Sequence, residues 1–252
     1  MNIGIYKGAA ALGAYEKWQE VVAQNLASAS VPGFKKSEIS FASVSDDGSK
    51  AGASGKPGDG TSGVMPRASA TINFAQGELR RTGADYDFAI QGDGLFQVQR
   101  GNGEVGYTRN GQFQLKSDRS LITTQGFPVM GESGPIIFPP GAAGPVSING
   151  EGMIFQGDQP VGKLAVYQFK DLQKLHRIGD GLMAPTSAGE KPALVEKATI
   201  LGGYLEQSNV SPMTEMVNLI EVSRAYEASQ KVIQSHDDSS DKAIQILGSP
   251  TA

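Results

Sequence analysis

The chain has 252 residues, of which 39% are hydrophobic and 19% charged, so it can bury one large core or two smaller ones and is neither a charge-rich disordered chain nor a membrane protein. Its formal net charge is −4, from 22 basic and 26 acidic side chains, and this balance cannot create the basic field that nucleic acid requires. The absence of cysteine excludes disulfides, thiolate metal sites and thiol nucleophiles.

The N-terminal residues lack the features of a targeting segment. No basic stretch precedes an uninterrupted apolar run, and nowhere do about 18 apolar residues follow one another. We therefore expect no cleaved signal peptide and no direct membrane insertion. If the protein leaves the cytoplasm, it must use a route that reads the uncleaved chain.

Residues 1–34 are predicted to form a helix. Apolar or small residues recur at alternating spacings of three and four, the pattern of a coiled-coil seam. These positions are Ile5, Gly8, Leu12, Tyr15, Val22, Leu26 and Ala29. The helix should end near Val31-Pro32-Gly33, because proline disfavours the helical conformation of the preceding residue and glycine accepts the conformation that ends a helix.

The next segment, residues 35–64, is predicted to be a linker. Ser45–Gly63 contains no large apolar residue, which is typical of a flexible Gly/Ser-rich loop.

The pattern changes again in residues 65–207. Short runs rich in β-branched and aromatic residues, such as residues 95–99 and 163–169, are interrupted by Gly, Asn, Asp or Pro roughly every eight to twelve residues. This predicts a mainly antiparallel β domain inserted between terminal helices, and hence an α+β fold.

A second helix is predicted in residues 208–252. Pro212 suits a first helical turn and Ser211 suits the N-cap. The seam positions are Met216, Leu219, Ser223, Tyr226, Ile233, Ser240, Ile244 and Leu247. We expect the two terminal helices to pair as a coiled coil. Further apolar residues off the seams predict contacts with neighbouring copies, namely Ile3, Trp18, Val21, Val217, Ile220 and Val232.

No motif in the sequence predicts catalysis or a cofactor. Gly101–Gly106 matches G-x-G-x-x-G, but a strand and a turn follow it rather than a helix, which favours a hairpin turn over a dinucleotide site. His176 and His236 have no His or Cys partner at ligand spacing. We therefore expect no enzymatic activity, no metal, no cofactor and no small-molecule substrate.

Four separated motifs resemble the bacterial flagellar rod and hook proteins. Gln24–Lys35 is similar to the N-terminal signature of this family, although Ser28 stands where its members usually have Asn. Leu205–Pro212, followed by Glu215-Met216-Val217 and Arg224–Glu227, resembles the C-terminal signature. Asp87–Val98 and Tyr107–Phe113 match the middle of the family in order and spacing. Within the family, the chain is most similar to the F-type rod proteins.

The resemblance implies a structural subunit of the flagellar basal-body rod. The paired helices would form an inner layer around the export channel and the β domain an outer layer. The partners would be copies of itself, proximal and distal rod proteins, and the flagellar type III export apparatus, which would deliver the chain to the periplasmic space without signal cleavage. Such a subunit would transmit torque from motor to hook.

Signature residues are expected at the joints between helices and β domain. They are Asn25, Pro32, Gly33, Phe34, Ser208, Asn209 and Val210. Asn25 and Asn209 would satisfy exposed backbone groups there, or simply cap locally. Two alternatives stay open at this point: a distal-rod or hook-type subunit of the same family, and a secreted β-rich adhesin-like binding module with its helices as a stalk.

Overall fold

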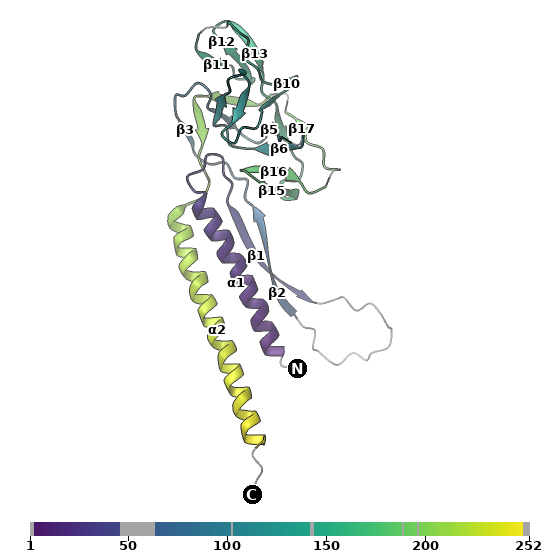
Figure 1. Cartoon of the computed structure of the whole chain (residues 1–252), viewed down its shortest axis with the longest axis vertical. Coiled ribbons are helices and arrows are strands. Elements are labelled where there is room, and N and C mark those ends of the chain that lie inside the picture. The colour runs from purple at the N-terminus through teal and green to yellow at the C-terminus, as the bar shows by residue number, and fades with distance from the viewer. Residues whose placement is uncertain are drawn as a thin grey trace. The chain divides into compact units, whose positions relative to one another are not determined.

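The computed structural model describes residues 3–45, 64–101, 103–141, 144–187, 189–195 and 197–248 (Figure 1). The chain divides into two compact units. The helical unit comprises residues 1–26, 37–71 and 211–252, and the β unit comprises residues 27–36 and 72–210. The predicted α+β class is confirmed, because long helices and mainly antiparallel strands make up the described residues.

In the helical unit, α1 (Ile3–Ala27) and α2 (Pro212–Gly248) run side by side in opposite directions (Figure 1). Contacts at three levels define the pairing. Asn25 Nδ2 donates to Glu215 Oε2 at 3.3 Å, and Tyr226 donates from its hydroxyl to Glu16 Oε1 at 3.2 Å. Near the other end, Ile233 packs so closely on Gly8 that a Cβ there would lie 2.8 Å from Ile233 Cγ1.

The start of α2 follows from its own sequence, whereas the end of α1 depends on the packing of the segment that follows it. α2 begins at Pro212, as predicted, because proline needs no backbone donor in a first turn. α1 ends at Ala27, several residues before the predicted boundary. The chain turns there, with Val31 N–H donating to Ser28 O at 3.1 Å, because residues 27–36 pack within the β unit.

A β-ribbon occupies part of the segment predicted to be a linker. β1 (Ser37–Ser45) pairs with β2 (Val64–Ile72), and residues 46–63 of the predicted loop lie outside the described residues. Phe41 of β1 makes edge-to-face contacts with Trp18 at 5.7 Å and Tyr15 at 6.5 Å, measured between ring centroids. Trp18, predicted to face a neighbouring copy, is therefore covered in part within the chain and is half-buried.

The β unit consists of short strands in several small sheets. The described strands are β3 (Leu79–Arg81), β4 (Phe88–Gln91), β5 (Leu95–Gln99), β6 (Val105–Thr108), β7 (Phe113–Leu115), β8 (Leu121–Thr123), β9 (Met130–Gly131), β10 (Gly134–Pro135), β11 (Val146–Ile148), β12 (Met153–Gln156), β13 (Gln159–Lys163), β14 (Val166–Gln168), β15 (Leu175–Gly179), β16 (Leu182–Pro185), β17 (Ala193–Leu194), β18 (Thr199–Gly202) and β19 (Tyr204–Glu206). A short 3-10 helix, η1 (Leu172–Lys174), precedes β15.

The largest sheet in the described residues has the order β15-β16-β6-β5-β14-β17 and is antiparallel. β11, β12 and β13 form a second antiparallel sheet, and the pairs β7–β8, β9–β10, β4–β18 and β3–β19 complete the unit. Gly101 and Gly103 lie in the turn between β5 and β6, where Arg100 N–H donates to Glu104 O at 2.8 Å. The hairpin interpretation of the glycine motif is confirmed.

Two apolar clusters fill the β unit. The larger includes fully buried Phe88, Phe96, Leu121 and Phe138, and the smaller surrounds Tyr107. Aromatic side chains therefore lie mainly between strands rather than on a binding surface. Within the described residues, no helix is long and apolar enough to cross a membrane, and no group of acidic and histidine side chains is arranged to hold a metal ion.

Candidate assembly site: the signature segments

The N-terminal signature meets the C-terminal one in the β unit, at Gly33. Gly33 N–H donates to Glu206 O at 2.7 Å, and the glycine has φ +68°, which L side chains rarely adopt. A Cβ at this position would lie 2.4 Å from the Arg109 carbonyl carbon and the Asn110 nitrogen. Three signature segments thus touch at one glycine, and the close approach of backbone to backbone excludes any side chain there.

Phe34 and Asn209 continue this contact. The Phe34 ring is buried beneath the Arg177 guanidinium, whose carbon lies 4.3 Å from the ring centroid. Asn209 N–H donates to Phe34 O at 3.3 Å, and Asn209 Oδ1 accepts from Lys36 N–H at 2.7 Å. Its Nδ2 donates to Asn73 O, at 3.0 Å. Asn209 therefore satisfies backbone groups from segments far apart in the sequence rather than capping its own helix.

The remaining signature residues are Pro32, Ser208 and Val210. Val210 is buried, and its N–H donates to Ser208 Oγ at 3.2 Å. Pro32 is half-buried in the turn before Gly33.

A buried ionic cluster lies under these contacts. Glu206 Oε1 accepts from Lys35 Nζ at 2.5 Å and from Gly77 N–H at 2.9 Å, while Glu206 Oε2 accepts from Arg109 Nε at 2.6 Å. Lys35 also donates to Ala75 O at 2.8 Å. All three charged side chains are at most 4% exposed, so the carboxylate is the acceptor for two buried cations.

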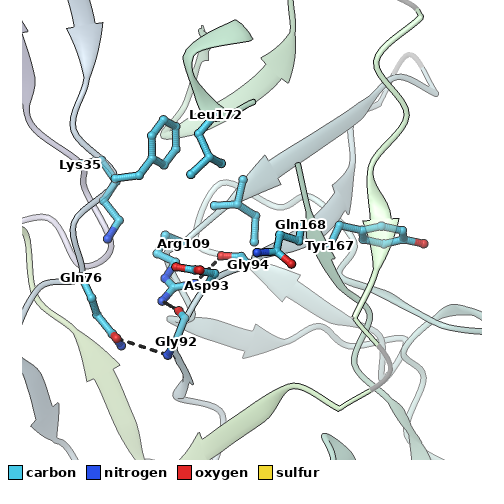
Figure 2. A pocket seen from close by; sticks show the side chains of 11 residues that line it. Lys35, Gln76, Gly92, Asp93, Gly94, Arg109, Tyr167, Gln168 and Leu172 are labelled. Atoms are coloured by element: carbon cyan, nitrogen blue, oxygen red, sulfur yellow. Dashed lines mark hydrogen bonds between the residues drawn. The ribbon is translucent and has the colours of Figure 1, made fainter. Parts of the chain in front are cut away.

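The other donors of Arg109 form hydrogen bonds with the loop between β4 and β5. Its Nη2 donates to Ile90 O at 3.2 Å and to Gly92 O, and its Nη1 donates to Gly94 O. Gln76 holds the same loop, donating to Ile90 O at 2.9 Å and accepting from Gly92 N–H at 3.2 Å. Figure 2 shows Lys35, Gln76 and Arg109 beside this loop, around a small pocket. The Arg109 guanidinium therefore joins this loop to the C-terminal signature, and Glu206 joins both to Lys35 of the N-terminal signature.

Burial changes the protonation equilibrium of Lys35. Two cations face one carboxylate, and burial lowers the pKa of Lys35 below its usual 10.5, although Glu206 opposes this shift. We did not predict the roles of Lys35, Arg109 and Glu206 from the sequence. The available signal was only that each charged residue stands in one of the signature segments.

Asn25 performs a corresponding role in the helical unit. Its Oδ1 accepts from Ser37 N–H at 2.8 Å and its Nδ2 donates to Ser37 O at 2.8 Å, so one side chain pairs with both backbone groups of the first residue of β1. Asn25 and Glu215, which it also contacts, are both buried. This asparagine ties α1 to β1 and α2 at once.

The predicted seam residues occupy different environments. Val22 is buried, and half-buried positions are Leu12, Tyr15, Leu26, Leu219, Tyr226 and Ile233. Met216 is largely exposed, because Glu215 takes the position that faces α1. The side chains of Ile5 and Leu247 lie outside those described. Of the off-seam residues, Val21 is buried, whereas Val217, Ile220 and Val232 are exposed.

Comparisons with known proteins identify the family. Residues 89–156 match the model of the flagellar hook protein FlgE/F/G D1 domain, and residues 201–246 match that of the flagellar basal body rod FlgEFG protein C-terminal region. The chain is 34% identical to the flagellar basal-body rod protein FlgF of Caulobacter vibrioides, covering 98% of this chain and 99% of the relative. It is 33% identical to FlgF of Mesorhizobium japonicum over 99% of both chains.

A second subtype is similar at nearly the same level. The rod protein FlgG of Buchnera aphidicola subsp. Schizaphis graminum is 33% identical, covering 90% of this chain and 92% of the relative. The chain therefore belongs to the family of flagellar basal-body rod proteins and is a FlgF-like structural subunit, not an enzyme.

Proposed function

We propose that the protein is an F-type subunit of the flagellar rod, assembled with copies of itself and with proximal and distal rod proteins, and that it transmits torque from motor to hook. The observation that carries this proposal is the similarity to FlgF proteins along nearly the whole length of both chains, 98% and 99%. A torque-bearing subunit needs extended interfaces rather than a pocket. The long α1 and α2, with apolar side chains exposed on α2, provide such surfaces.

Within the subunit, α1 and α2 act as a paired coiled coil that forms an inner layer around the channel, and the β unit forms the outer layer. The contacts at residues 25, 16 and 8 support this pairing, because they lie at three successive levels along both helices. The half-buried Leu12, Leu219 and Ile233 contribute seam contacts between them.

The chain reaches the periplasmic part of the rod unfolded, through the flagellar type III apparatus and without signal cleavage. A chain without cysteine suits this route, since no disulfide can trap a misfolded form after export to an oxidising compartment. A distal-rod role is the second candidate, favoured by the 33% identity to FlgG proteins.

Purified basal bodies provide the test. Deleting the gene should abolish swimming, and basal bodies from complemented cells should contain the protein in the rod. Leu219→Asp, which places a charge on the α1-facing side of α2, should prevent incorporation, whereas Gln230→Asp at an exposed position should not. Basal bodies that lack the wild-type protein, or normal swimming of the deletion strain, would refute the proposal.

A further inference from the structure

A ridge of large apolar side chains on α2 has no partner within the described helical unit. Met213, Met216, Val217 and Ile220 are 74%, 49%, 49% and 55% exposed. Their spacing of three and four places them on one face of the helix. Neighbouring apolar side chains of this size on one face are typical of an interaction surface rather than of scattered surface residues.

This ridge points away from the chain's own α1. Glu215 and Tyr226 mark the α1-facing side, because they bond to Asn25 and Glu16. At 3.6 residues per turn, Val217 lies about 200° around α2 from Glu215. The chain's own α1 therefore cannot cover the ridge, which is left open to a partner from outside.

Two glycines of α1 indicate which surface that partner presents. Glycine is a poor residue in the middle of a helix, so its presence calls for a close neighbour. Gly8 has one, since a Cβ there would collide with Ile233 of the same chain. Gly13 has none: a Cβ there would meet nothing within 4 Å, and Ala9, one turn earlier, is also exposed. The outward face of α1 at Gly13 is thus an open, shallow site for large apolar side chains.

We propose that the α2 ridge of one copy packs against α1 around Gly13 of a second copy, which deepens the proposed rod function and rests on it. The contact continues the existing pairing, because α2 would then have an α1 on each of its opposite sides. The large apolar side chains of the α2 ridge would pack where Gly13 leaves the surface of α1 without a side chain. The same two helices serve both contacts, so a chain of alternating α1 and α2 extends from copy to copy.

The contact requires a shift between copies along the helix axis. Within one chain, residue 16 contacts 226 and residue 8 contacts 233, so Gly13 lies level with about residue 228. The ridge, centred near Val217, lies about 11 residues away, or roughly 16 Å at a rise of 1.5 Å per residue. Copies at equal height cannot make this contact. It is heterologous and staggered, and repetition generates a helical assembly rather than a flat ring.

Engineered cysteines test the stagger directly, because the native chain has none. Gly13→Cys combined with Val217→Cys cannot close within one chain, where the two positions are roughly 16 Å apart along the helices, beyond the reach of a disulfide. Oxidation of purified basal bodies should give a ladder of linked copies, while the free subunit stays monomeric. The matched pair Gly13→Cys with Glu227→Cys, which would meet only in copies at equal height, should give no ladder.

The outcomes separate the interface from the function. The staggered contact is wrong if the Gly13/Val217 double variant is present in rods but forms no ladder on oxidation, or if the Gly13/Glu227 variant forms one; the rod function stands in either case. Absence of the wild-type protein from rods refutes both the contact and the rod function. A photo-reactive residue at Val217 should yield a product of twice 26.4 kDa. A product of another mass would mean that a different axial protein covers the ridge, and would overturn the proposal.

Discussion

Glu206→Gln is expected to destabilise the β unit more than Lys35→Met does. The carboxylate accepts from Lys35, Arg109 and Gly77. An amide keeps one acceptor oxygen and turns an NH₂ group toward one of the two cations. Breaking a buried ion pair in this way, with both cations left uncompensated, costs about 3–5 kcal/mol, or roughly 10 °C in melting temperature for a unit of this size.

Lys35→Met is the matched control, and its expected cost is smaller. It leaves the Arg109–Glu206 pair intact and electrically balanced. Ala75 O loses the lysine but still accepts from Asn209 Nδ2 at 3.0 Å. The structure therefore predicts a loss of about 1.5–3 kcal/mol, the usual contribution of hydrogen bonds to a charged group.

Amide hydrogen exchange at β5 measures the stability of the β unit in the full chain. Trp18, the single tryptophan, reports the helical unit separately by fluorescence. We expect faster exchange at β5 in Glu206→Gln than in Lys35→Met, with the Trp18 signal unchanged in both. A Glu206→Gln protein within about 1 kcal/mol of wild type, or a reversed order of the two variants, would refute the role assigned to the cluster.

Four further predictions concern single features. First, as the pH rises toward 10.5, the usual pKa of lysine, the free energy of unfolding of the wild type should rise relative to Lys35→Met. Burial lowers the pKa of Lys35, so the unfolded chain binds more protons than the folded one in this range; parallel pH profiles from urea titrations would contradict this. Second, Gly33→Val should reduce swimming and lower the melting temperature, because its Cβ would collide with the Arg109 backbone and the strained φ costs about 1–2 kcal/mol of folding free energy. Gly83→Val is the control for the collision, because Gly83 also has a positive φ but a Cβ there would meet open space. Third, Asn25→Ala should cost about 1–3 kcal/mol for each backbone group of Ser37 left buried without a partner, seen as faster amide exchange in β1 than in wild type, whereas Gln24→Ala at an exposed position should exchange normally. Fourth, a fragment of residues 27–210 should melt cooperatively while one of residues 65–207 should not, because the shorter fragment lacks Phe34, Lys35 and Asn209; equal cooperativity would show that these residues do not belong to the unit.

The start of a helix and the positions of strands could be predicted from the sequence where neighbouring residues determine them. Pro212 predicted the start of α2, and the glycine-interrupted apolar runs predicted the antiparallel strands. β1 was missed because the surrounding Ser and Gly content outweighed the alternation of Ile39 and Phe41, and because the strand depends on Trp18 from α1 for its packing.

Features that depend on distant partners were not predictable from the sequence. Lys35 and Glu206 are separated by 171 positions, and Arg109 and Glu206 by 97. No spacing rule links such residues, so their meeting in a buried cluster could not be predicted. The early end of α1 has the same origin, since the contact of Gly33 with Glu206 fixes the path of the following segment.

Electron cryomicroscopy of isolated basal bodies, at a resolution that shows side chains, tests the proposed assembly most directly. It should place this subunit in the rod, with α1 and α2 paired in the layer that lines the channel and the β unit outside them. The Met213–Ile220 ridge should be covered by α1 of a neighbouring copy near Gly13. Density for the subunit outside the rod, or with its two helices apart and facing outward, would contradict the assembly.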